Sequence, residues 1–152
     1  YRTTATMMYG HLEADEDIIE HLGHVRALQD ETGGFTAFIP WSYKRDNTAL
    51  GKRIKDVAGP NRYLKMIALS RIYLDNFPHI KTFWIMNSIE ISQVALWYGA
   101  DDIDGTVMDY EITRSSYEDT EQRLTQTELL DRIAEAGREA VERDSLYNLV
   151  PL

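Results

Sequence analysis

The chain has 152 residues, of which 43% are hydrophobic and 27% are charged, a composition typical of a folded globular domain. Its 25 acidic and 16 basic side chains give a formal charge of -9, which argues against nucleic acid as a partner. No apolar run reaches the roughly 20 residues that a membrane-spanning helix needs, and there is no cysteine for a disulfide or an iron–sulfur cluster.

The beginning of the chain predicts a strand, a helix and a second strand. Residues 4–9 have the short pattern of a buried strand that ends at Gly10. Acidic residues open a helix near residue 13, and apolar residues recur at helical spacing up to Gly33. Residues 35–41 return to strand composition, and we expect Pro40 at the strand end, where a missing N–H costs least.

The middle of the chain repeats this alternation after a polar stretch. Residues 42–61 have no sustained apolar period, which indicates a long functional loop. Ile72 is expected on the buried face of the helix that follows. The expected elements are a helix over 63–76, a strand over 80–86, a helix over 88–98 and a strand over 101–107.

The last strong signal is a capping box formed by Thr125 and Glu128, which predicts a fourth helix that ends near Gly137. Strands that alternate with helices predict an α/β fold with parallel strands. We predict four βα units that form half of a TIM-type barrel, because a complete barrel needs about 250 residues. An open Rossmann-like sheet ranks lower, since no G-x-G-x-x-G follows the first strand.

Four strings spread over most of the chain resemble one branch of the radical S-adenosylmethionine (SAM) superfamily. They are TATMMYGHLE (4–13), LQDETGGFTAFIPW (28–41), ALSRIYLDNFPHIKTFWI (68–85) and GADDIDGTV (99–107). The branch comprises aminofutalosine synthases, cyclic dehypoxanthine futalosine synthases and deazaflavin-forming synthases. The strings FPHIKTFWIM, DDIDGTV and GREAVERDSLYN resemble the aminofutalosine synthases most.

The resemblance implies that residues 1–152 are the C-terminal half of a cytoplasmic radical SAM barrel of menaquinone biosynthesis. The family's CxxxCxxC triplet is absent, so the four-iron four-sulfur cluster and SAM are expected in the whole protein and no cofactor or metal in this chain. The implied transferase reaction adds the adenosyl group of SAM to 3-[(1-carboxyvinyl)oxy]benzoate with decarboxylation. This chain alone is expected to be inactive.

Two alternatives remain open from the sequence. The chain could come from a cyclic dehypoxanthine futalosine synthase or a deazaflavin synthase of the same branch. It could also be a non-catalytic module that binds adenosine or a partner protein. The sequence cannot name the catalytic residues of any of these.

The resemblance implies a cofactor site at the end of the first strand. Met8, Gly10 and Glu13 match the superfamily motif G-x-I-x-G-x-x-E, with Thr6 in place of its first glycine. The polarizable thioether of Met8 suits the flat face of adenine. A core methionine, a turn glycine and a helix-opening carboxylate explain the same three residues equally well.

The second strand and the first loop supply further candidates. Ile39 and Pro40 match the strand whose backbone binds the adenine edge in related enzymes, although core packing also explains Ile39. His11 lies where a strand becomes a helix and is predicted to bind substrate, because imidazole can donate and accept hydrogen bonds. A structural loop histidine is the alternative.

Acidic residues in the fourth predicted strand suggest a substrate site. Asp104 and Thr106 share one face by the period of two, and charged side chains are rarely buried without partners. A short edge strand with solvated acids is the alternative. Arg71 is expected in a salt bridge, and His79 falls at the end of the barrel opposite the chemistry.

The expected partner is a small-molecule substrate in the whole protein, with neither nucleic acid nor membrane. His21 and His24 read as a solvated helix face, since no H-E-x-x-H pattern surrounds them. A half-barrel exposes two sheet edges, and we therefore expect the isolated chain to self-associate through these edges.

Overall fold

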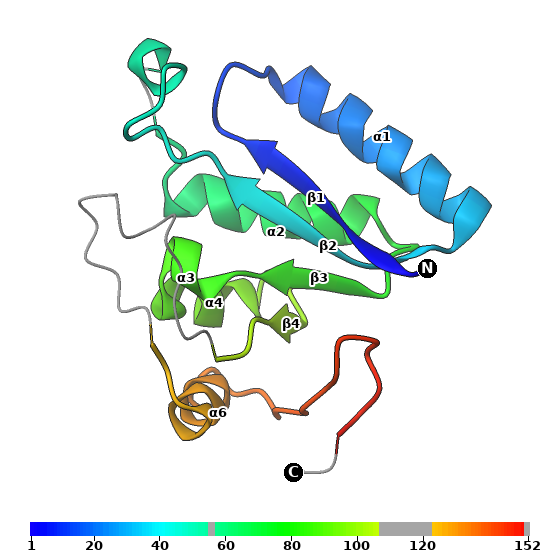
Figure 1. The fold of residues 1–152 in the computed structure, drawn as a ribbon, viewed down its shortest axis with the longest axis vertical. Helices are drawn as coiled ribbons and strands as arrows, with labels where there is room; N and C mark the ends of the chain where they lie inside the picture. Colours follow the sequence, from blue (N-terminus) through cyan, green and yellow to red (C-terminus); the bar gives the residue numbers. More distant parts are fainter. Residues whose placement is uncertain (55–56, 107–122, 151–152) are drawn as a thin grey trace.

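The computed structural model describes residues 1–54, 57–106 and 123–150, and these residues build a parallel sheet in the order β1-β2-β3-β4 (Figure 1). The strands are β1 (Thr3–Tyr9), β2 (Phe35–Ser42), β3 (His79–Thr82) and β4 (Asp102–Ile103). The helices are α1 (Asp15–Thr32), α2 (Pro60–Tyr73), α3 (Trp84–Asn87), α4 (Ile89–Ala95) and α6 (Gln126–Glu135), with a short 3-10 helix η1 (Gly51–Arg53). The predicted α/β architecture is confirmed.

The predicted helix boundaries follow from local hydrogen bonding. The Ala14 N–H donates to the Asp17 carboxylate at the start of α1, and Gly33 ends that helix with a left-handed φ of 57°. Thr125 and Glu128 form the predicted capping box of α6. The main helices therefore begin and end where their sequence signals place them.

The strands have one face covered by helices. Ala5, Met7 and Tyr9 of β1 are buried in the same cluster as Ile18 and Leu22 of α1. Because side chains alternate along a strand, the intervening residues point to the opposite face. Figure 1 looks onto this opposite face, with α2 behind the sheet.

We call this opposite side the open face. Thr6 pairs with Ile39 and Met8 with Trp41 in the β1–β2 register, so these four side chains share the open face. In β3, Ile80 and Thr82 are buried toward the helices, where the Tyr63 hydroxyl and Thr82 Oγ1 are 2.7 Å apart. Their neighbour Lys81 therefore lies on the open face. The open face of the strands is formed by Thr4, Thr6, Met8, Ala37, Ile39, Trp41, Lys81 and Asp102.

Two predicted strands are shorter than expected. β3 stops at Thr82, and the apolar run from Phe83 to Met86 forms the start of α3 instead of strand. All four of these residues are buried in a second cluster with Leu124 and Leu129, and a short apolar run does not separate a buried helix from a buried strand. β4 covers only Asp102–Ile103, so Asp104 and Thr106 lie beyond it, and Val107 is outside the described residues.

Two single-residue expectations were also wrong. Pro40 lies inside β2, fully buried and paired with Met7. The ladder between β2 and β3 pairs Phe38 with Ile80 as its last described step, so the missing N–H of Pro40 disrupts no ladder bond on that side. Ile72 is 78% exposed, on the outer side of α2.

The chain after α6 returns to the sheet. This tail, residues 138–150, runs back along β4 toward the strand starts (Figure 1). Its Arg143 binds Asp102, and its Tyr147 ring stacks on His79 with 4.2 Å between ring centroids. The tail therefore covers the β4 side of the sheet, and the outer edge of β1 has no strand partner within the described ranges.

Candidate functional site

The loop after β1 is held by one carboxylate. Gly10 has a φ of 86°, and a Cβ at this position would lie 2.7 Å from the Ala58 Cβ, so only glycine fits without strain. The Glu13 carboxylate accepts hydrogen bonds from the Gly10 N–H at 2.5 Å and the His11 N–H at 2.8 Å. Its side chain is only 10% exposed, and Arg62 lies 3.5 Å away.

The charge of Glu13 is stabilised by this loop. Burial alone would raise the pKa of Glu13, but the hydrogen bonds from the Gly10 and His11 amides outweigh burial and lower it. The structure thus brings the predicted cofactor residues Gly10 and Glu13 together. The Gly10 N–H and the Glu13 carboxylate bind each other, so both residues determine the conformation of the loop.

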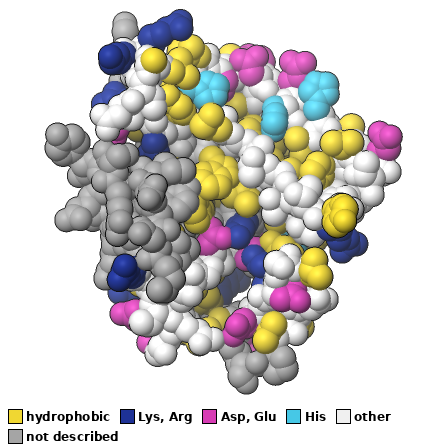
Figure 2. Space-filling view, in the orientation of Figure 1, with side chains coloured by type: hydrophobic (Ala, Val, Ile, Leu, Met, Phe, Trp, Pro, Cys, Tyr) yellow, Lys and Arg dark blue, Asp and Glu magenta, His cyan; other side chains and the backbone are white. Residues whose placement is uncertain are grey.

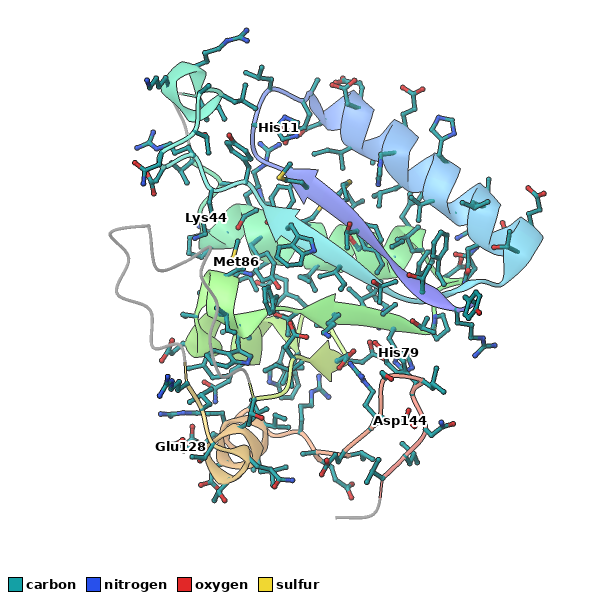
Figure 3. All side chains as sticks on the ribbon, in the orientation of Figure 1. His11, Lys44, His79, Met86, Glu128 and Asp144 are labelled. Carbon is teal, nitrogen blue, oxygen red and sulfur yellow. The ribbon has the colours of Figure 1, made fainter. Side chains whose placement is uncertain are left out.

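His11 lies at the C-terminal end of the sheet, at the opposite end from His79 (Figure 3). Its Nδ1 accepts a hydrogen bond from the Leu12 N–H at 2.8 Å, and its ring meets the Tyr43 ring edge-on at 6.0 Å. The side chain is 28% exposed. This arrangement places His11 on the rim, where its predicted contact with substrate stays a prediction.

Met8 and two aromatic rings form an apolar surface beside this rim. Met8 is 55% exposed on the open face, opposite Trp41 in the neighbouring strand. The rings of Trp41 and Phe83 are 4.9 Å apart between centroids, and the buried Trp41 Nε1 has no hydrogen-bond acceptor among the described residues. A flat ligand could stack here. The side chains of Ile39 and Pro40 are buried, so any contact from them would use the backbone.

An ion pair between Lys81 and Asp104 lies on the open face. Their side chains are 16% and 17% exposed, and the Lys81 Nζ contacts the Asp104 Oδ1. Burial raises the pKa of the Asp104 carboxyl, although Lys81 beside it acts in the opposite direction. In the orientation of Figure 1, Figure 2 shows acidic and basic side chains together in a hollow near the middle of this face. Thr106 is exposed and shares no strand with Asp104.

The N-terminal end of the sheet carries a second set of charges. Asp101 accepts from Arg71 Nη2 at 2.5 Å and from the Ile80 N–H at 2.8 Å, and its other oxygen is 2.9 Å from His79 Nδ1. The predicted salt bridge of Arg71 and the placement of His79 away from the strand ends are confirmed. These groups fasten β3, β4 and α2 to one another.

His21 and His24 of α1 lie in different environments. His24 is exposed near Glu20, as a solvated face predicts, whereas the Nε2 of His21 is buried. No group of three or more histidine, aspartate or glutamate side chains in the described ranges could hold a metal ion. No helix in those ranges is long and apolar enough to cross a membrane.

Sequence reasoning missed Lys81, Trp41 and Phe83. A lysine in a short strand reads as a solvated edge residue, and the two aromatic residues read as core. The available signal was that Lys81 alternates with the apolar Ile80 and the buried Thr82 in a strand of a two-layered sheet. This signal points to a site only in combination with the predicted barrel, in which the face opposite the helices is the inner face.

Comparison with known proteins identifies the family of this chain. Residues 32–152 match the family described as the CofH/MqnC C-terminal region. An aminodeoxyfutalosine synthase from Thermus thermophilus is 43% identical over 150 residues, which cover 97% of this chain and 40% of that protein. One from Streptomyces coelicolor is 40% identical over 98% of this chain and 41% of its own length.

A cyclic dehypoxanthine futalosine synthase from Streptomyces coelicolor is 38% identical over 95% of this chain and 35% of that protein. The chain thus spans 40% and 41% of the length of the two synthases. These matches confirm the resemblance in the four sequence strings. The chain belongs to the family of the CofH/MqnC C-terminal region.

Proposed function

We propose that this chain is the C-terminal half-barrel of an aminodeoxyfutalosine synthase. The whole enzyme would add the adenosyl group of SAM to 3-[(1-carboxyvinyl)oxy]benzoate with decarboxylation, in menaquinone biosynthesis. The observation that carries this proposal is similarity over 97% and 98% of the chain to two proteins of that name. The parallel sheet supports it, because enzymes of the barrel class bind substrate at the carboxyl ends of their strands.

The residues of this chain fit only part of the cofactor set. The chain has no cysteine and does not fit an iron–sulfur cluster, which the rest of the enzyme would have to hold. The adenosyl part of SAM fits better, because Met8 offers an exposed thioether beside Trp41 on the open face. When bound, SAM supplies the adenosyl group of the reaction.

The chain's own residues would position reactants and keep water away. Trp41 offers a half-buried aromatic ring that packs on the buried Phe83, and the hydrogen bonds of Glu13 fix the loop after β1. Holding two reactants in a fixed relative geometry is a large part of what such a scaffold contributes to rate. The hard bond cleavage belongs to the cofactor.

Anaerobic reconstitution of the full-length protein tests the proposal. Iron uptake, followed by formation of a product with the mass of aminodeoxyfutalosine from SAM and the carboxyvinyloxybenzoate, is the expected result. A protein that instead converts only dehypoxanthine futalosine would be the cyclase. Binding of adenosine without any turnover would favour the non-catalytic module.

We also propose that the isolated chain is catalytically silent, binds SAM weakly or not at all, and self-associates. The outer edge of β1 lacks a strand partner within the described ranges, whereas Arg143 and Tyr147 of the tail cover the β4 side. Sedimentation should show a dimer or larger species that persists as salt is varied. A monomer at tens of micromolar would contradict the self-association. Micromolar SAM binding by calorimetry would contradict the weak binding of SAM.

A further inference from the structure

Lys81 has an unusual position for a lysine. Its neighbours Ile80 and Thr82 are buried toward the helices, so its side chain extends over the open face, where it is only 16% exposed. Lysine is among the side chains least often buried, because removing the ammonium group from water is costly. On the same face, the register partner of Lys81 is Asp102, whose carboxylate is bound by Arg143 and Tyr147, so the ammonium group of Lys81 needs another partner.

Asp104 accounts for only part of the hydrogen-bonding capacity of Lys81. An ammonium group has three N–H donors, and Asp104 is the ion-pair partner of Lys81 among the described residues. A carboxylate that approached from the open face could therefore accept from a remaining donor.

The apolar side of the same site matches an aromatic ring. Phe83 follows Lys81 by two residues and has an extended φ of -115° and ψ of 96°, so both side chains lie along the same line. The rings of Trp41 and Phe83 are 4.9 Å apart between centroids, and the buried Trp41 Nε1 has no hydrogen-bond acceptor in the described part of the chain. An aromatic surface next to an ammonium group has the two features that an aryl carboxylate needs.

We propose that Lys81 binds the ring carboxylate of the substrate, that Trp41 and Phe83 contact its ring, and that Asp104 positions the Lys81 ammonium group. This inference rests on the proposed function, since it assigns residues to the ring carboxylate of that function's substrate, which the rim residues do not contact. It also changes the predicted role of Asp104. The aspartate acts through Lys81 and does not touch the substrate carboxylate, which it would repel.

The test compares wild-type and Lys81→Gln forms of the full-length reconstituted enzyme on two substrates, one with and one without the ring carboxylate. Lys81→Gln should raise the KM for 3-[(1-carboxyvinyl)oxy]benzoate by about 30-fold or more, the effect expected when one member of a desolvated charge pair is removed. The analogue without the ring carboxylate should be a poor substrate for the wild-type enzyme, and Lys81→Gln should make it no worse. A similar loss for both substrates would overturn the proposal.

Two further variants keep the result interpretable. Lys81→Gln combined with Asp104→Asn removes both charges together and avoids an unpaired buried aspartate, so it carries the test if the single variant does not fold. It should show the same dependence on the ring carboxylate. Lys65→Gln, on the exposed side of α2, is the matched control and should leave both KM values unchanged.

A binding measurement separates this inference from the proposed function. Calorimetry with 3-hydroxybenzoate and phenol needs no turnover, and the wild-type protein should bind the acid more tightly than the phenol. Lys81→Gln should abolish that preference. A wild-type enzyme that makes no aminodeoxyfutalosine but keeps the preference would refute the proposed function alone, whereas equal binding of both probes would refute the role of Lys81.

Discussion

Two neighbouring aspartates at β4 are used in different ways. The side chain of Asp102 is 7% exposed, accepts hydrogen bonds from Arg143 through both carboxylate oxygens and also accepts from the Tyr147 hydroxyl. Two residues later, the side chain of Asp104 is 17% exposed and forms an ion pair with Lys81 on the open face. Asp102 fastens the tail to the sheet, and Asp104 pairs with the Lys81 ammonium group, to which we assign the substrate carboxylate.

The difference lies in how completely each group is satisfied. A buried carboxylate that uses all its acceptor capacity within the protein has little left for a ligand, and its removal leaves buried cations unpaired. A pair that faces an open surface keeps donors available. Stability should therefore depend on Asp102 and its partners in the tail, and substrate binding should depend on the Lys81–Asp104 pair.

The largest effect on stability is expected from breaking the cluster of Asp102, Arg143 and Tyr147. Asp102→Ala leaves Arg143 and Tyr147 without their shared acceptor and should lower the free energy of unfolding by about 3 kcal/mol, at the low end for a broken buried pair because Arg143 keeps some exposure. Urea denaturation measures this change. The tail should also become more sensitive to limited proteolysis.

Asp131, an exposed aspartate on α6, supplies the control for that experiment. Asp131→Ala should change the free energy of unfolding by no more than about 0.5 kcal/mol, as most surface substitutions do. If Asp102→Ala were equally mild, the tail would not be fastened by this cluster, and the contrast between the two aspartates would fail.

Two glycines allow the next comparison, one at each end of the sheet. Gly10 and Gly99 have φ values of 86° and 114°, and a Cβ would lie 2.7 Å from Ala58 Cβ and from Arg71 Cβ respectively. Gly10→Ala and Gly99→Ala should each cost about 2 kcal/mol of stability, from the left-handed backbone and the close contact together. Thermal unfolding measures both.

Function should separate the two glycine variants. Gly10→Ala disturbs the rim loop and should also weaken SAM binding by the full-length enzyme, whereas Gly99→Ala should not. Adding Ala58→Gly to Gly10→Ala removes the contact but not the backbone strain, so it should recover part of the lost stability. No recovery at all would mean that the loop does not meet Ala58.

Sequence reasoning succeeded where local signals determine the structure. The capping box at Thr125 and the left-handed Gly33 mark helix ends through hydrogen bonds within a few residues, and both were predicted. The alternation of strands and helices was enough to predict the parallel sheet. The run from Phe83 to Met86 was misread, because its apolar character reflects burial and not secondary structure.

The candidate site depends on pairs that are distant in the sequence. Lys81 and Asp104 lie 23 positions apart, and Asp102 meets Arg143 41 positions further along the chain. No local pattern encodes such pairs. Asp104 was predicted from its charge alone, but its partner and hence its role as a positioning residue required the register of β3 and β4.

A smaller effect, and one that depends on pH, is expected at Glu13. Glu13→Gln keeps the size of the side chain but replaces a carboxylate that accepts from two amides, at a cost of about 1–2 kcal/mol at pH 7. The pKa of Glu13 is lowered in the folded protein from its ordinary value of 4.5. Its contribution is therefore fully present above pH 4.5 and is lost as pH falls through the folded pKa.

Urea denaturation of the wild-type and Glu13→Gln proteins from pH 7 down to pH 3 checks this expectation. The difference between the two should shrink as the pH falls below 4.5. Glu16→Gln, at an exposed position in the first turn of α1, is the control with a constant small difference. A Glu13 difference that grows in acid would show that the carboxylate is not stabilised by the loop amides.

The smallest effect on stability separates the two faces of a single strand. Met7 is 5% exposed and packs toward the helices, whereas its neighbour Met8 is 55% exposed on the open face. Met8→Ala should change the free energy of unfolding by no more than about 0.5 kcal/mol, and Met7→Ala should lower it by about 2–4 kcal/mol. In the full-length enzyme Met8→Ala should nevertheless weaken SAM binding, because the thioether beside Trp41 is lost. Equal stability losses for the two methionines would mean that Met8 is buried by another part of the protein, and unchanged SAM affinity would remove Met8 from the cofactor site.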